Sequence, residues 1–160
     1  MTVKLKKLAD QVIVITGASS GIGLVTARLA AKRGARVVLN ARNEEALQHV
    51  TDEINAQGGH AIYVVGDVGQ FEAVQRIADE AVQHFGGFDT WVNNAGVSIY
   101  GTVLDQSLED QRRLFETNYW GTVHGSMVAC AHLRSRGGAL ITDLPQAPKT
   151  LRCPLLRKGG

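Results

Sequence analysis

The chain has 160 residues, with 17 lysines and arginines against 15 aspartates and glutamates, a formal net charge of +2, and 44% hydrophobic residues. A chain of this length can bury about two thirds of its unfolded surface, so the composition predicts one soluble domain without structural disulfides or metals. Its two cysteines, Cys130 and Cys153, exclude a zinc finger and a Cys-x-x-Cys redox pair. Low cysteine usage favours a reducing compartment, and we expect a cytoplasmic protein.

The N-terminal segment is expected to be neither a signal peptide nor a membrane span, because its apolar run breaks at Gly17 without a cleavage site. Charge and proline are concentrated at the other end. Residues 143–160 carry four basic residues against one acidic residue and contain all three prolines, while the rest of the chain is close to neutral. We therefore predict a body over residues 1–142 and an irregular basic tail over 143–160.

Short β-branched runs alternate with longer amphipathic stretches through the body. The runs expected to form buried strands are residues 12–16, 37–40, 61–65, 90–93 and 139–142. The helices expected between them cover residues 21–33, about 43–58, about 74–85 and about 107–134. This alternation predicts an α/β fold, a Rossmann-like doubly wound parallel sheet that is incomplete, with about five strands and four helices.

The fourth helix is expected to begin at Ser107, which opens a capping-box pattern. Its large apolar residues follow an i+4 row, which predicts one buried face. That row consists of Phe115, Tyr119, Val123 and Met127.

A glycine-rich loop follows the first predicted strand and opens the first helix. Glycines allow a sharp turn and a close approach of backbone N–H groups to a pyrophosphate, and the helix dipole stabilises the anion. A tight turn alone would not require so many small residues at one connection. The predicted phosphate-binding residues are Gly17, Ser19, Ser20, Gly21, Ile22 and Gly23.

Arg42 follows the second strand, where an acidic residue would favour NAD and an arginine favours the 2′-phosphate of NADP. We expect NADP(H), with a solvated arginine at a helix start as the alternative. Asp67 follows the third strand and would either accept a hydrogen bond from adenine or cap the next helix. After the fourth strand, Asn93 and Asn94 would either bridge neighbouring strand ends or form an Asx turn.

These motifs, in this order, resemble the short-chain dehydrogenase/reductase family. The resemblance covers residues 11–142 and rests on TGASSGIG, on Asp67-Val68, on NNAG and on Asn118. It implies that NADP(H) lies with its adenine beside Asp67 and Val68 and its ribose near Asn93 to Gly96, so that Asn94, Ala95 and Gly96 bind cofactor. It also implies that Asn118 is the catalytic-site asparagine that holds a water in the proton relay. An interhelix hydrogen bond on a buried face is the alternative for Asn118.

The resemblance ends before the family's other catalytic residues. The family uses a serine after the fifth strand and a Tyr-x-x-x-Lys on the next helix, where lysine and cofactor lower the tyrosine pKa. The three tyrosines, Tyr63, Tyr100 and Tyr119, have no lysine four residues later. The serine position falls near Leu144 and Pro145. We therefore expect a chain truncated after the fifth strand, with an unrelated tail and with Asn118 as its only catalytic residue.

Two functions follow. The first is an NADP-dependent oxidoreductase that transfers a hydride to or from a carbonyl or alcohol substrate, although this chain is expected to be catalytically incompetent. The alternative is a non-catalytic NADP-binding fragment, or a dimerisation partner of a full-length relative, with helix 109–134 as a candidate homo-oligomer contact. The sequence indicates neither a metal site nor a nucleic-acid or membrane partner. The tail is expected to be mobile, and the fifth strand an edge prone to association.

Overall fold

A computed structural model describes residues 6–143. After a short 3₁₀ turn, η1 (Leu8–Asp10), strands and helices alternate along the chain. The strands are β1 (Val12–Thr16), β2 (Arg36–Ala41), β3 (His60–Val65), β4 (Thr90–Asn93) and β5 (Ala139–Thr142). The helical segments are α1 (Gly21–Lys32), α2 (Glu44–Ala56), α3 (Phe71–Phe85), α4 (Leu108–Phe115), the π-helical turn η2 (Glu116–Trp120) and α5 (Gly121–Arg136).

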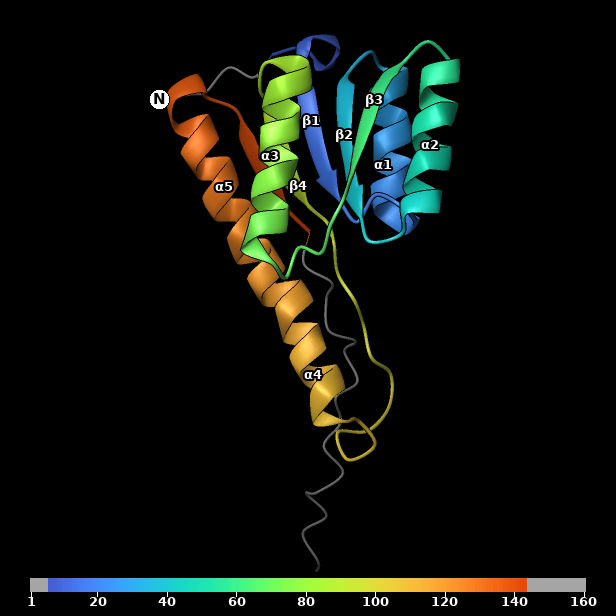
Figure 1. Ribbon diagram of the computed structural model, residues 1–160, viewed down its shortest axis with the longest axis vertical. Helices are drawn as coiled ribbons and strands as arrows, with labels where there is room; N and C mark the ends of the chain where they lie inside the picture. The colour runs from blue at the N-terminus through green and yellow to red at the C-terminus, as the bar shows by residue number, and fades with distance from the viewer. Residues whose placement is uncertain (1–5, 144–160) are drawn as a thin grey trace, which may run out of the picture.

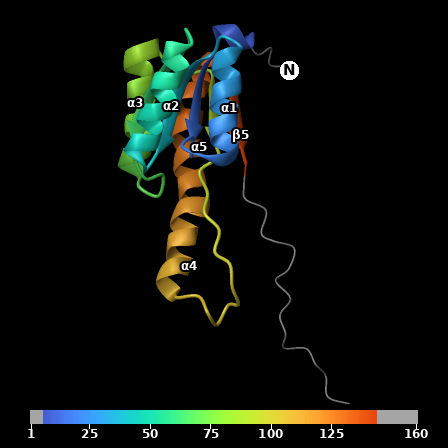
Figure 2. The ribbon, with the colours of Figure 1, turned by 90° about the vertical axis from the view of Figure 1, so that its right-hand side faces the viewer.

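The five strands form one parallel sheet in the order β3-β2-β1-β4-β5, which confirms the predicted doubly wound architecture. Side chains alternate along each strand, so β1 sends Ile13 and Ile15 to one face and Val12 and Val14 to the other. Helices α1 and α2 cover the first face, and α3 and α5 cover the second (Figures 1 and 2). The strand order reverses between β1 and β4, where such sheets place their ligands.

The fourth predicted helix is one continuous rod, because α4, η2 and α5 join through residues in right-handed helical conformation. Ser107 caps it as expected, since its Oγ accepts a hydrogen bond from the Asp110 N–H at 3.0 Å. Helix α5 packs on the sheet, whereas α4 buries none of its side chains and projects beyond the sheet (Figure 1).

The prediction of the buried face of this helix was wrong. Phe115, Tyr119 and Met127 are 62%, 54% and 58% exposed, and Val123 is only half-buried. The buried row lies two residues out of phase with them and consists of small residues: Thr117, Gly121, Gly125 and Ala129. Small side chains let the helix approach the sheet closely, and this packing outweighs the burial of large apolar side chains.

Strand β5 also differs from the expectation of a strand buried on both faces. Leu140 and Ile141 are 37% and 50% exposed, because β5 pairs only with β4 in the described residues and forms the predicted edge. Of the predicted tail, only Asp143 is described, and its N–H donates to the Asn93 carbonyl at 2.9 Å. The expectation of a mobile tail lies otherwise outside the described residues.

Candidate cofactor site

A cavity of about 570 Å³ opens at the carboxyl ends of β1, β2, β3 and β4. Residues from the connection that follows each of these strands line it together with Thr117 of η2. Of the predicted cofactor-binding residues, all except Gly23 line the cavity: Gly17, Ser19, Ser20, Gly21, Ile22, Arg42, Asp67, Val68, Asn94, Ala95 and Gly96. Four separate sequence motifs therefore meet at one place.

Glycine is required at two positions of the loop between β1 and α1. Gly17 has φ +66°, and a Cβ there would lie 2.7 Å from the Ala95 Cα. Gly23 lies behind the loop, where a Cβ would approach the Gly17 carbonyl oxygen to 2.3 Å. The absence of both side chains lets α1 and the β4 connection close around the loop, so Gly23 shapes the cavity without lining it.

The first turn of α1 suits an anion. Ser20 is its N-cap residue and makes no side-chain capping hydrogen bond, which leaves the first-turn N–H groups available within the described residues. Ile22 in this turn is 68% exposed. Free N–H groups and the positive end of the helix dipole together fit a phosphate.

The bridging interpretation of Asn94 is confirmed. Its Nδ2 donates to the Thr16 carbonyl at 2.9 Å and to the Gly17 carbonyl at 3.2 Å. In return, the Thr16 Oγ1 accepts from the N–H groups of Asn94 and Ala95, both at 3.0 Å. These bonds fix the β4 connection against the glycine loop and hold the cavity open between them.

Asp67 does not cap a helix, because α3 begins after Gln70 as its N-cap residue. Its Oδ1 accepts from the Gly69 N–H at 3.0 Å, and its Oδ2 forms an ion pair with Arg113 at 2.6 Å. Partial burial acts to raise the pKa of Asp67, but the hydrogen bonds from Gly69 and Arg113 and the charges of Arg113 and Arg42 outweigh it and lower the pKa. Asp67 therefore presents an ionised carboxylate at the cavity.

Asn118 lies in η2 and makes a paired contact with the β4 connection. Its Nδ2 donates to the Val97 carbonyl at 2.9 Å, and its Oδ1 accepts from the Val97 N–H at 2.8 Å. The side chain thus makes structural hydrogen bonds, but they join the helix to the connection after β4 and not to another helix. Its backbone carbonyl accepts from Thr122 Oγ1 at 2.8 Å. The catalytic role of Asn118 stays a prediction.

The cavity has further lining residues that the sequence reading missed: Asn40, Ala41, Asn43, Gly66, Val97, Thr117 and Asp143. Most of them directly adjoin predicted residues at strand ends, and the strand-end rule could have found them. Thr117 is different, because it comes from the long helix and only tertiary packing brings it to the cavity. The Asn40 side chain ties β2 to β3 by donating to the Val64 carbonyl at 3.0 Å and the Gly66 carbonyl at 3.2 Å.

Comparison with known proteins decides the family. Residues 11–143 match the sequence model of the family described as short chain dehydrogenase. The chain belongs to this family. An uncharacterized oxidoreductase, YxnA, of Bacillus subtilis (strain 168) is 61% identical over 140 residues, which cover 86% of this chain and 39% of the relative. Versicolorin reductase stcU of Emericella nidulans is 39% identical over 138 residues, which cover 86% of this chain and 52% of the relative.

Solved structures of the short-chain dehydrogenase/reductase family share the fold. A family member from Burkholderia phymatum in complex with NAD has a TM-score of 0.82 at 34% identity, over 86% of this chain and 50% of that one. A family member from Mycobacterium marinum has a TM-score of 0.80 at 37% identity, over 85% of this chain and 56% of that one. The chain thus spans about half the length of the short-chain dehydrogenases it matches, or less.

Within residues 6–143, no three histidine, cysteine, aspartate or glutamate side chains gather as a metal site would require. No helix of that range has the length and apolar character needed to cross a bilayer.

Proposed function

We propose that this chain is the cofactor-binding part of an NADP(H)-dependent short-chain oxidoreductase, and that it binds NADP(H) without catalysing hydride transfer. One observation supports the proposal above all others: motifs from four strand ends line a single cavity at the reversal of strand order. The family acts on small molecules, and we propose a carbonyl or alcohol as the substrate of the whole protein. We also propose that the protein is located in the cytoplasm.

The described residues fit a dinucleotide. The uncapped first turn of α1 and the positive-φ glycines Gly17 and Gly21 would hold the pyrophosphate. Asp67 would accept from the adenine amino group, and Asn94 to Gly96 would lie against the ribose and the ring beyond it. In the whole protein a bound nicotinamide would supply the hydride donor or acceptor, and these residues would orient it.

The preference for NADP rests on Arg42. It is exposed at the cavity beyond β2, and no salt bridge engages it in the described part of the chain. Residues 40–42 contain no acid that would bind a ribose 2′-hydroxyl. NAD is the competing cofactor, since a family member of known structure binds it.

Replacement of Arg42 by alanine tests the preference. A hydrogen bond to a charged group contributes about 1.5 to 3 kcal/mol, so R42A should weaken NADPH binding roughly tenfold to a hundredfold. The affinity for NADH should stay nearly unchanged, because NADH lacks the 2′-phosphate. Fluorescence titration of both nucleotides measures this. Arg33→Ala serves as the control, because Arg33 is an exposed arginine beyond the other end of α1.

Equal affinities for NADPH and NADH before and after the substitution would overturn the NADP assignment.

The same preparations test catalysis. Without a lysine-activated tyrosine, oxidation of NADPH with simple aldehydes and ketones should stay at background, since acid–base catalysis alone contributes about a hundredfold to ten-thousandfold. Turnover above background by the purified chain would contradict the non-catalytic part of the proposal.

A further inference from the structure

The connection between β3 and α3 forms the adenine side of the cavity, and it packs along the long helix. The Val68 carbonyl lies 3.0 Å from His124 Nδ1 of α5. Gly121 lets Val68 approach closely, since a Cβ there would lie 2.5 Å from Val68 Cγ2. Gly69 fits against η2, where its Cβ would be 3.3 Å from the Glu116 carbonyl oxygen. The position of this connection therefore depends on the helix.

Arg113 extends this contact to α4. Its Nη2 lies 2.6 Å from Asp67 Oδ2, and the two side chains are 39% and 21% exposed. Because α4 buries no side chain, this ion pair is a specific link between α4 and the body of the protein. The partner of Arg113 in this ion pair, Asp67, lines the adenine side of the cavity, whereas Arg113 itself does not line it. Arg113 can therefore influence the cavity through Asp67.

The geometry of Asp67 leaves room for a ligand. An ionised carboxylate offers about four acceptor sites on its two oxygens. One site on Oδ1 accepts from the Gly69 N–H, and one on Oδ2 accepts from Arg113. With respect to residues 6–143, each oxygen retains a free acceptor site, and the two existing bonds fix the rotation of the carboxylate about its Cβ–Cγ bond.

We propose that Arg113 is a positioning residue for cofactor recognition: it holds the Asp67 carboxylate so that the free acceptor sites meet the amino group of adenine. This inference rests on the proposed function. It predicts discrimination between purines, because adenine presents an amino donor at this position whereas hypoxanthine presents a carbonyl oxygen, which the carboxylate repels. Arg113 thereby becomes a determinant of base specificity.

The test compares NADPH with its hypoxanthine analogue, which differs only at that group. Wild type should bind NADPH about tenfold to a hundredfold more tightly, as expected for a hydrogen bond to a charged group. Arg113→Gln should reduce this ratio to near one, because the carboxylate loses its charged partner and rotates. Arg113→Lys should give an intermediate ratio, since a lysine keeps the charge without the planar fork. Arg112→Gln, an exposed neighbour on α4, should retain the wild-type ratio.

Each other outcome counts against the inference. If the ratio of the two affinities in R113Q equals that of wild type, the inference is overturned; if R113Q fails to fold, the same result in R113K overturns it. Tight NADPH binding in that case leaves the proposed function intact. Loss of affinity by one common factor for both nucleotides would indicate a purely structural role and also overturns it. If neither nucleotide binds wild type, the proposed function fails and this inference fails with it.

Discussion

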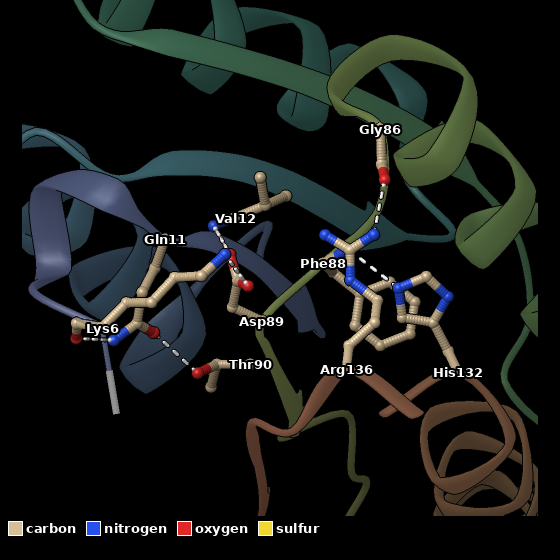
Figure 3. A network of polar contacts seen from close by, with 9 residues as sticks. All are labelled: Lys6, Gln11, Val12, Gly86, Phe88, Asp89, Thr90, His132 and Arg136. Atoms are coloured by element: carbon tan, nitrogen blue, oxygen red, sulfur yellow. Dashed lines mark hydrogen bonds and ion pairs between the residues drawn. The ribbon is translucent and has the colours of Figure 1, made fainter. Parts of the chain in front are cut away.

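His132 illustrates how a single residue can set a pH dependence for the fold. Its ring stacks on Phe88 with centroids 4.1 Å apart, and its Nε2 accepts from the Phe88 N–H at 3.2 Å (Figure 3). Arg136 of the same helix donates to the Gly86 carbonyl at 2.9 Å. Partial burial and the charge of Arg136 lower the pKa of His132, although the charge of Asp89 opposes this. The neutral ring, which can accept from Phe88, is the native form.

We expect this histidine to lower stability at acid pH. The unfolded chain takes up a proton near pH 6.5, while the folded chain takes it up only at lower pH. The contribution of neutral His132 is therefore complete above pH 6.5 and declines as pH falls from there toward the folded pKa. Thermal melts between pH 5 and 8 should show a shallower decline for His132→Gln, which does not titrate.

His49→Gln is the matched control, since it removes an exposed histidine of α2 and leaves the contact between His132 and Phe88 in place. A pH profile of His132→Gln that superimposes on that of wild type would contradict the assignment. The same region contains Asp89, whose carboxylate accepts from Lys6 at 2.6 Å and from the Val12 N–H at 2.9 Å. Partial burial acts to raise the pKa of Asp89, but the hydrogen bonds from Lys6 and Val12 and the charges of Lys6 and Arg136 outweigh it and lower the pKa, so this carboxylate stays ionised over the range of the melts.

At the scale of elements, the π-helical turn η2 joins the two sides of the cavity. Asn118 binds Val97 on the β4 side, and on the adenine side a Cβ at Gly69 would lie 3.3 Å from the Glu116 carbonyl oxygen. Turns of this kind are frequently found at functional sites. Because the turn lies between an anchored α5 and a projecting α4, a movement of α4 would reach the cavity through it.

Close packing of α5 on the sheet depends on Gly125. A Cβ there would lie 2.1 Å from Asn93 Oδ1 and 2.8 Å from Trp91 Nε1, and these two atoms hydrogen-bond each other at 2.8 Å. Gly125→Ala should destabilise the protein by about 1 to 3 kcal/mol or more, as overpacking typically does. Urea unfolding measures this. Cys130→Ala, on the exposed side of the same helix, should change stability little, and equal stabilities of both variants would contradict the packing argument.

The sequence predicted those features that local rules determine. Turn glycines, strand-end positions and the Ser107 cap follow from backbone chemistry, and the first two predicted residues that line the cavity. The ion pair between Asp67 and Arg113 could not be predicted, because it joins residues 46 positions apart through the tertiary placement of α4. The buried face of the long helix was misjudged for a related reason: apolar periodicity favours large side chains, whereas Gly121 and Gly125 are buried because they are small.

At the scale of the whole molecule, exposed large apolar side chains occur along the long helix and on β5, as well as on α1, on α3 and in the segment before α4. Those of the long helix and β5 include Phe115, Tyr119, Trp120, Met127 and Ile141. Apolar surface contributes about 25 cal/mol per Å² when it is removed from water, so a few hundred Å² would supply several kcal/mol. That is comparable with the stability of a typical domain, and it favours association of the chain.

We expect the chain to self-associate through the long helix. Sedimentation velocity over a range of micromolar concentrations should show a dimer whose fraction rises with concentration. Tyr119→Lys combined with Met127→Lys should abolish it, because a dimer contact would bury two charges without partners, which is costly. These residues are already exposed, so the folded monomer should lose little stability. Ile141→Lys tests whether the dimer contact lies at the edge strand β5 instead, because a charge on an edge strand blocks its pairing with the sheet of another molecule. A dimer that survives the helix substitutions and disappears in I141K would place the contact at β5.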